Sequence, residues 1–253
     1  MSTADLPGRI ETLNAVQIYF EDHGSGNEPL FVLHGFSGSS QDWNSSSPQL
    51  TERFRVIAPD LRGHGRSGIL AAPFRHQDAA RDMLALLDLL KIDSCKGIGV
   101  SCGGNVLLHM AAIQPERLKA MVLVSATPYF PAQARAIMRQ YSQSVTPEQF
   151  EQLRANHPGG DEQVRALLAS TAAFADSYDD MNFTPPLLAT VRARTLIVQG
   201  DRDPLYPVDL SVEMAKAIPR SSLWIVPDAG HGPVIGKRWS GFLDTAIEFL
   251  NEA

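Results

Sequence analysis

The sequence predicts an α/β fold with a mostly parallel central sheet, flanked by helices and interrupted by an inserted helical segment. Short apolar runs recur along the chain, and amphipathic helical stretches separate most of them. Continuous apolar runs are typical of strands buried on both faces, and strands that alternate with helices indicate parallel βαβ crossovers. One long stretch contains no convincing strand, which indicates an insertion between two strands.

The individual strands and helices follow from these patterns in chain order. Residues 10–21 alternate in polarity around Asn14-Ala15, which predicts a β-hairpin at the start of the fold. Apolar runs predict strands at 30–33, 55–58, 97–100, 121–124, 196–199 and 223–226. Apolar residues at helical spacing predict helices at 78–90, 105–113, 208–217 and 239–250.

The stretch 128–191 breaks the alternation of strands and helices. Helical patterns lie at 133–143 and 163–174, and Thr146-Pro147, followed by Gln149, has the residues of a capped helix start. Pro185-Pro186 is expected to end the stretch. The sequence therefore predicts a core domain at 1–127 and 192–253 and a helical cap, or lid, at 128–191.

Composition limits the classes of partner. The chain has 253 residues and a formal net charge of −6, so the basic patch that nucleic-acid binding requires is not expected. No run of Lys and Arg and no apolar span indicates a membrane partner. Residues 1–7 lack the basic and apolar regions of a signal peptide, and two cysteines are too few for a disulfide framework. We expect reduced thiols and a cytoplasmic location.

A turn that exposes a serine is the strongest chemical signal. Residues 99–103 read Gly-Val-Ser-Cys-Gly, which matches G-x-S-x-G between a predicted strand and a predicted helix. Such a turn holds the serine in a strained conformation with its hydroxyl exposed, and the flanking glycines allow close backbone approach. The N-terminus of the helix favours developing negative charge. These features predict Ser101 as a nucleophile.

A serine nucleophile needs a general base, and His231 is the best candidate of the seven histidines. It follows the last predicted strand, at the carboxyl edge where open α/β sheets bind ligands. Ordinary structural or surface roles are expected for His23, His64, His76, His109 and His157. The orienting acid should follow the strand at 196–199, where Asp201 and Asp203 are both available.

At this point the chain resembles the α/β-hydrolase superfamily, in particular its serine esterases and lipases with a helical cap. The family pattern Gly-x-x-Asp-x-x-x-Pro, matched from Gly200 to Pro207, selects Asp203 as the acid. The residues His-Gly-Phe at 34–36 match the family's oxyanion turn, which implies the backbone N–H groups of Phe36 and Cys102 as oxyanion donors. The segment 60–67 matches a structural loop of the family.

The resemblance implies a serine hydrolase that cleaves carboxylic esters through an acyl-enzyme, as carboxylesterases do. The same three side chains also serve C–C bond hydrolases, lactonases, thioesterases and perhydrolases, so these alternatives stay open. A binding or sensor protein on this fold typically lacks part of the triad. A serine at the turn, where haloalkane and epoxide chemistry of this kind uses a carboxylate, argues against those two activities.

The expected partner is a small-molecule ester, and the oligomeric state is left open. No G-x-G-x-x-G directly follows a predicted strand, and no Walker A motif and no metal-ligand spacing of His and Cys occurs, so neither a cofactor nor a metal is expected. Aromatic and Met side chains on helices usually belong to the core. Those that we expect to line a substrate pocket are Tyr129, Phe130, Trp43 and Met138.

Overall fold

The computed structural model describes residues 8–44 and 47–252, so residues 1–7, on which the signal-peptide prediction rests, lie outside it. Within the described residues, eight strands form one sheet in the order β1-β2-β4-β3-β5-β6-β7-β8. The strands are β1 Arg9–Leu13, β2 Val16–His23, β3 Glu28–Leu33, β4 Phe54–Pro59, β5 Cys95–Val100, β6 Leu118–Val124, β7 Arg194–Gly200 and β8 Ser221–Val226.

The sheet is parallel except at one edge, where β1 and β2 form the predicted hairpin. β1 pairs antiparallel with β2, and β2 pairs antiparallel with β4, whereas all pairs from β4 to β8 are parallel. The hairpin turns at Asn14 and Ala15, which both have positive φ, as a two-residue turn between twisted strands requires. These findings confirm the predicted α/β fold class.

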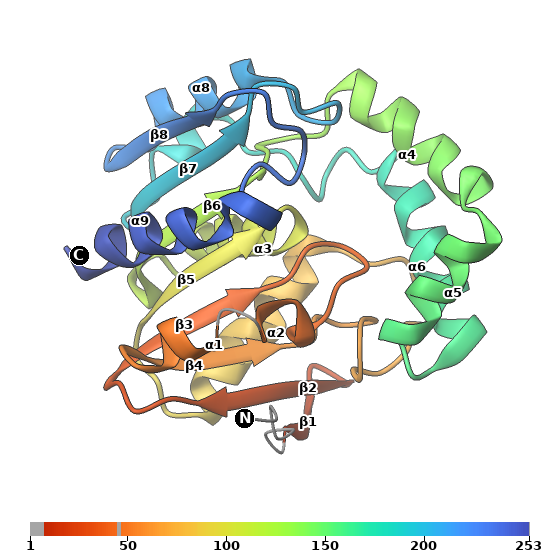
Figure 1. Cartoon of the computed structure of the whole chain (residues 1–253), viewed down its shortest axis with the longest axis horizontal. Helices are drawn as coiled ribbons and strands as arrows, with labels where there is room; N and C mark the ends of the chain where they lie inside the picture. The colour runs from red at the N-terminus through yellow and green to blue at the C-terminus, as the bar shows by residue number, and fades with distance from the viewer. Residues whose placement is uncertain (1–7, 45–46, 253) are drawn as a thin grey trace.

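Helices cover both faces of the sheet (Figure 1). One face carries α1 (Ser47–Thr51), α9 (Trp239–Asn251) and the 3-10 helix Ser40–Trp43, packed in one apolar cluster. The other face carries α2 (His76–Leu89), α3 (Cys102–Ile113) and α8 (Val208–Ala217), packed in a second cluster. The stripe of Met83, Leu86 and Leu87 on α2 is fully buried, as its helical spacing predicts.

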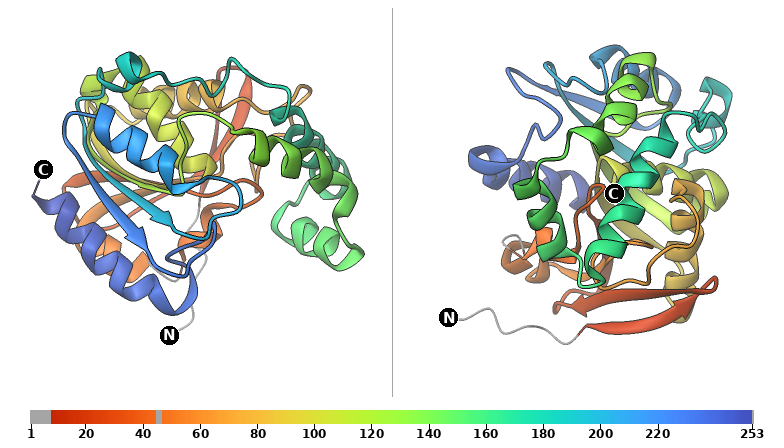
Figure 2. Two further views of the ribbon diagram at one scale, coloured as in Figure 1. Left: turned by 90° about the horizontal axis from the view of Figure 1, so that it is seen from above. Right: turned by 90° about the vertical axis from the view of Figure 1, so that its right-hand side faces the viewer.

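The insertion between β6 and β7 carries four helices among the described residues: α4 Ala132–Ser144, α5 Pro147–Asn156, α6 Gly160–Phe174 and α7 Pro185–Leu188. Helices α4 to α6 stand beyond one end of the sheet (Figures 1 and 2). The hydroxyl of Thr146 accepts from the N–H of Gln149, which confirms the predicted helix start. The expectation that Pro185-Pro186 ends the insertion is wrong, since proline is tolerated in a first helical turn and α7 begins there.

Within residues 8–44 and 47–252, no helix has the length and apolar character that crossing a bilayer requires. The segment 60–67 is a structural loop, as the sequence predicts. The carboxylate of Asp60 accepts from the backbone N–H groups of Ser40 at 2.6 Å and Arg66 at 2.7 Å. The side chain of His34 likewise accepts from the N–H of Leu61, at 3.0 Å. These contacts fix the loops that follow β3 and β4 at the carboxyl edge of the sheet.

Candidate active site

Ser101 lies in the turn that connects β5 to α3. Its backbone has φ 49° and ψ −109°, a conformation that side-chain-bearing residues rarely adopt. The flanking glycines are required by contact: a Cβ on Gly99 would lie 2.5 Å from the carbonyl of Gly103, and one on Gly103 would lie 2.3 Å from the carbonyl oxygen of Leu33. The local sequence thus allows the tight turn that raises the hydroxyl above the sheet.

His231 contacts Ser101 although the two residues are 130 positions apart. Its Nε2 lies 2.8 Å from the Oγ of Ser101, a distance typical of a hydrogen bond. The loop after β8 carries His231, and the hydroxyl of Ser125 donates to the His231 carbonyl at 2.7 Å. The ring also packs edge-on against Tyr206, with ring centroids 5.2 Å apart. These contacts hold the imidazole in place over the serine.

Asp203 contacts the other nitrogen of the imidazole. The Nδ1 of His231 lies 2.8 Å from Oδ2 of Asp203, whose side chain is fully buried. The amides of Leu205 and Tyr206 donate to Oδ1. Burial raises the pKa of Asp203, but the hydrogen bond and charge of His231 and the two amides outweigh it, so the pKa lies below its usual value. The carboxylate is therefore ionised and fixes the proton of His231 on Nδ1.

Two further residues clarify the choice of the acid. Asp201 accepts from the N–H of Ala229 at 3.2 Å and lies 3.8 Å from Nε of Arg202, so the structure places it in loop contacts and not at the imidazole. Gln199, which its apolar run predicts only as a strand residue, donates its Nε2 to Oδ2 of Asp203 at 2.7 Å and to the carbonyl of Tyr206 at 3.0 Å. Its position near the end of β7, four residues before the acid, is the signal that could have identified it.

The resemblance implies the backbone N–H groups of Phe36 and Cys102 as oxyanion donors. Both residues line the cavity that contains Ser101. Cys102 is the first residue of α3, so its N–H has no acceptor within the helix. No backbone carbonyl in the described part of the chain accepts from the N–H of Phe36. The Cys102 thiol is buried, which raises its pKa well above the usual value and argues against a reactive role.

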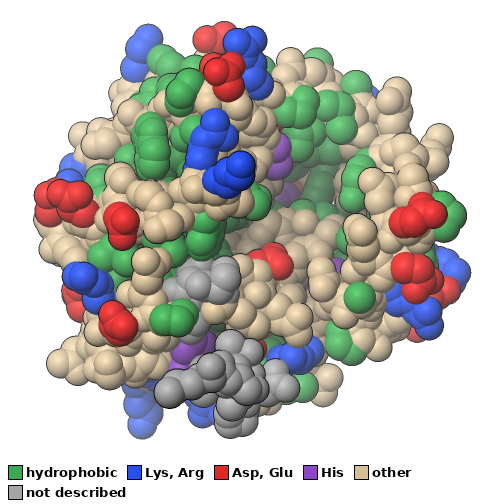
Figure 3. Space-filling model, viewed as in Figure 1, with side chains coloured by type: hydrophobic (Ala, Val, Ile, Leu, Met, Phe, Trp, Pro, Cys, Tyr) green, Lys and Arg blue, Asp and Glu red, His purple; other side chains and the backbone are tan. Residues whose placement is uncertain are grey.

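A cavity of about 350 Å³ opens above Ser101, between the insertion and the sheet. Figure 3 shows the corresponding hollow, with hydrophobic and histidine side chains along its sides. Its apolar walls come from the insertion and from the rest of the chain. The described residues that line it include no Lys, Arg, Asp or Glu. Such a volume and lining are typical of sites for small organic ligands.

The structure places two of the four predicted pocket residues on this cavity and two elsewhere. Phe130 and Met138 line it. Trp43 lies on the opposite face of the sheet and packs against Trp239, because its 3-10 helix covers that face. Tyr129 is not part of the lining, and its hydroxyl donates to Glu213 on α8 at 3.2 Å. The predictions for Trp43 and Tyr129 as pocket residues are therefore corrected.

His76, for which the sequence suggested an ordinary structural or surface role, also lines the cavity. Its Nδ1 lies 2.8 Å from Asp180, a residue that sequence reasoning did not consider. With regard to metals, no three His, Cys, Asp or Glu side chains of the described chain gather in a way that would hold an ion.

Several curated proteins are similar to the chain. A dihydrolipoyllysine-residue acetyltransferase component of an acetoin cleaving system from Pseudomonas putida is 29% identical over 89% of the chain, which spans 64% of that protein. A pimeloyl-[acyl-carrier protein] methyl ester esterase from Nitrosomonas europaea is 27% identical, covering 86% of the chain and 94% of the esterase. A 2-hydroxymuconate semialdehyde hydrolase from Pseudomonas sp. is 27% identical, covering 97% of the chain and 94% of that hydrolase.

Solved structures and family patterns agree with this similarity. A meta-cleavage product hydrolase matches with a TM-score of 0.79 and 22% identity, covering 97% of this chain and 98% of the other. A thermophilic esterase from Thermogutta terrifontis matches with a TM-score of 0.78 and 25% identity, with the same coverage. Residues 179–252 match the family described as TAP-like protein, and residues 28–185 match the alpha/beta hydrolase fold family. The chain belongs to the α/β-hydrolase fold family.

Proposed function

We propose that the chain is a serine hydrolase that cleaves carboxylic esters through an acyl-enzyme. In this proposal Ser101 is the nucleophile, His231 the general base and Asp203 the orienting acid. The observation that carries it is the continuous relay at the cavity, with 2.8 Å between Ser101 Oγ and His231 Nε2 and 2.8 Å between His231 Nδ1 and Asp203 Oδ2. Nucleophile, base and orienter within hydrogen-bond reach define an activated serine.

The first half of the reaction makes the acyl-enzyme. Nε2 of His231 takes the proton of Ser101 as Oγ forms a bond to the ester carbonyl carbon, and the carbonyl electron pair moves onto oxygen. The N–H groups of Phe36 and Cys102 donate to this oxyanion, at the N-terminus of α3. The C–O bond to the alcohol then breaks, the carbonyl re-forms, and His231 gives its proton to the leaving oxygen.

The second half releases the acid. His231 takes a proton from a water molecule, whose oxygen attacks the acyl carbon of the Ser101 ester. The second tetrahedral oxyanion rests on the same two amides, and its collapse breaks the bond to Oγ. His231 returns the proton to Ser101, which restores the starting state. Asp203 keeps the imidazole in the required tautomer and stabilises its charged form throughout.

An uncharged ester is the substrate class that the cavity favours. Moving a carboxylate from water into a protein interior without a cationic partner costs on the order of several kcal/mol of desolvation free energy. The described lining of the cavity contains no Lys or Arg that would offset this cost. This argues against anionic substrates such as the 2-hydroxymuconate semialdehyde in the name of one relative. We further propose that residues 128–191 act as a cap, since Phe130, Met138 and Phe174 of this stretch cover the cavity.

The test is hydrolysis of 4-nitrophenyl esters of short fatty acids by the purified chain and by Ser101→Ala. We expect the variant to lose about 10⁴-fold or more in kcat. Ser222→Ala, which removes an exposed serine on β8, is the matched control and should keep the parent rate. A fluorophosphonate should label the parent stoichiometrically at Ser101. An unchanged rate in Ser101→Ala would contradict the proposal, and a protein that takes no label would fit a non-catalytic binding role.

The bond type is tested by comparing substrates that share the triad chemistry. A matched set consists of an ester, a thioester, a lactone and a vinylogous diketone with a cleavable C–C bond, all uncharged and of similar size. We expect the highest kcat/KM for the ester. A higher value for the C–C substrate would replace the ester assignment with C–C hydrolysis while leaving the roles of Ser101 and His231 intact.

A further inference from the structure

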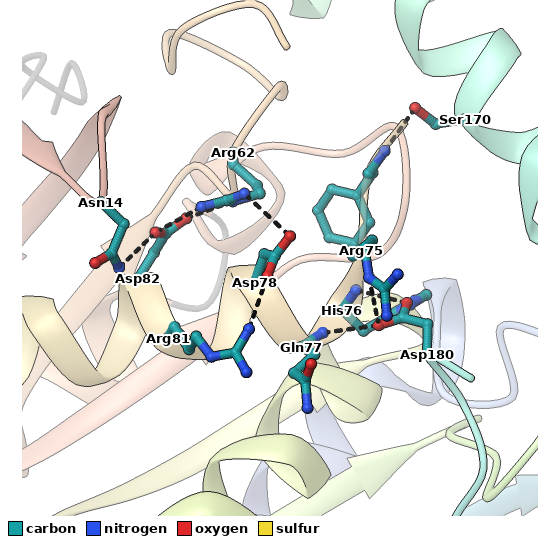
Figure 4. A network of polar contacts seen from close by, with 11 residues as sticks. Asn14, Arg62, Arg75, His76, Gln77, Asp78, Arg81, Asp82, Ser170 and Asp180 are labelled. Carbon is teal, nitrogen blue, oxygen red and sulfur yellow. Dashed lines mark hydrogen bonds and ion pairs between the residues drawn. The ribbon is translucent and has the colours of Figure 1, made fainter. Parts of the chain in front are cut away.

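His76, which lines the cavity, forms a second histidine–carboxylate pair with Asp180, and the proposed reaction does not use this pair. His76, the first residue of α2, and Asp180, in the segment after α6, are each 2% exposed. Figure 4 shows them side by side at the start of the helix. The Nδ1 of His76 lies 2.8 Å from Oδ2 of Asp180, the same distance as between His231 and Asp203. A buried pair of this kind on a cavity wall calls for an explanation.

Asp180 holds the pair in a fixed geometry. Oδ2 also accepts from the backbone N–H of His76 at 2.8 Å, and Oδ1 accepts from that of Gln77 at 3.1 Å. Burial raises the pKa of Asp180, but its hydrogen bonds to His76 and Gln77 outweigh this effect, so the pKa lies below its usual value. The ionised carboxylate accepts the proton on Nδ1 and thereby orients the imidazole ring of His76.

The other ring nitrogen of His76 is the one with a free hydrogen-bonding position. None of the described residues forms a hydrogen bond with Nε2. The ring lies among Phe74, Phe130 and Phe174, with centroids 5.2, 5.7 and 5.0 Å away, so three aromatic rings surround it. His76 lines the same cavity as Ser101. A ligand in the cavity therefore meets an oriented polar nitrogen in an apolar wall.

We propose that His76 is a specificity-determining residue that hydrogen-bonds a hydroxyl group on the acyl part of the substrate, so that the site favours esters of hydroxy acids. The proposal rests on the proposed function, because it takes the acyl part to occupy this cavity. Nε2 accepts a hydrogen bond when the imidazole is neutral and donates one when it is protonated, and a hydroxyl is able to serve both. A carboxylate would lie close to the ionised Asp180 with no Lys or Arg in the described lining to offset its charge.

The test measures binding in a protein that does not turn over the ligand. In a Ser101→Ala background, calorimetry compares methyl hexanoate with methyl hexanoates hydroxylated at carbon 2, 3 or 6, positions that do not lactonise readily. We expect at least one hydroxy ester to bind about tenfold more tightly than methyl hexanoate, and His76→Phe to abolish this preference. Phenylalanine keeps an aromatic ring among its three aromatic neighbours, and Asp180 keeps the two backbone donors at positions 76 and 77.

The measured quantity is the ratio of the affinity for a hydroxy ester to the affinity for methyl hexanoate. Because unfolded protein lowers both affinities equally, this ratio separates recognition of the hydroxyl from protein stability. Arg81→Gln is the matched control: it removes an exposed ion pair with Asp78 at 2.9 Å on the same helix and should leave the ratio unchanged. A preference that survives His76→Phe, or no preference for any hydroxy ester, overturns the proposal. If the parent protein, with Ser101 intact, did not hydrolyse esters, the proposed function would be refuted. The proposal for His76 would still be testable, because the affinity ratio does not depend on hydrolysis.

Discussion

Replacing Asp203 with asparagine tests the role of the carboxylate with almost no change in shape. Oδ1 accepts from the amides of Leu205 at 2.8 Å and Tyr206 at 3.1 Å, and Oδ2 accepts from Gln199 at 2.7 Å and His231 at 2.8 Å. Asparagine has only one side-chain oxygen. We expect this oxygen to face the two backbone amides. In the opposite orientation the NH₂ group of the asparagine would face the N–H groups of Leu205 and Tyr206, which are also donors.

The NH₂ group of asparagine then faces His231 and can only donate to Nδ1. His231 must carry its proton on Nε2, where the proton points at Ser101 Oγ and prevents this nitrogen from acting as a base. Loss of the correct tautomer lowers kcat by about 10⁴-fold in other enzymes with this triad, which is about 5 kcal/mol of transition-state stabilisation. We expect a loss of the same order for Asp203→Asn.

The assay is initial-rate hydrolysis of a 4-nitrophenyl ester at neutral pH, with the thermal midpoint as a check that the variant folds. Asp201→Asn is the matched control, because Asp201 contacts the N–H of Ala229 and the side chain of Arg202, which both lie outside the relay. We expect it to stay within about threefold of the parent, as substitutions outside the relay usually do. Comparable activity in Asp203→Asn and the parent, or a larger loss in Asp201→Asn, would refute the reasoning.

Two further predictions concern stability. Gly103→Ala should lower the free energy of unfolding by about 2 kcal/mol, because its Cβ would lie 2.3 Å from the Leu33 carbonyl oxygen. Gly241→Ala, in open space on α9, should raise the free energy of unfolding by about 0.5 kcal/mol. Denaturant titration measures both changes. The folded pKa of Asp180 lies below that of an unfolded aspartate, about 3.9, so its stabilisation is complete above that pH and is lost as the pH falls through the folded pKa. The gap in melting temperature between the parent and Asp180→Asn should therefore be widest at neutral pH and narrow as the pH falls below about 4 toward the folded pKa, and a gap independent of pH would contradict this.

The fold was accessible to sequence reasoning because its strands are buried on both faces. All six predicted apolar runs lie inside observed strands, and the four predicted helices of the core match α2, α3, α8 and α9 to within a few residues. The short helices α1 and α7 and the 3-10 helix Ser40–Trp43 were missed. Helices of one turn bury too few side chains to leave an apolar repeat, so no periodic signal marks them.

The three residues of the relay were predicted for a topological reason. Ser101, Asp203 and His231 follow β5, β7 and β8, and parallel strands bring their carboxyl ends to one edge of the sheet. A residue after a strand in such a sheet therefore has a predictable place even when its partners are more than a hundred positions away. Tyr129 also follows a strand, β6, but its side chain points toward α8, which strand order does not determine.

The pairing of His76 with Asp180 follows no such rule. This difference separates the groups that would carry out the chemical step from those that would bind the substrate. The two residues are 104 positions apart, and Asp180 comes from the insertion, which meets the start of α2 through this side-chain pair. The sheet fixes the groups that would make and break bonds, whereas the insertion brings Met138 and Phe174 and, through Asp180, the orientation of His76. Since binding groups outside the relay can change without disturbing it, substitutions in the insertion should alter substrate preference more than the chemical step, and those at the carboxyl ends of the strands should do the reverse.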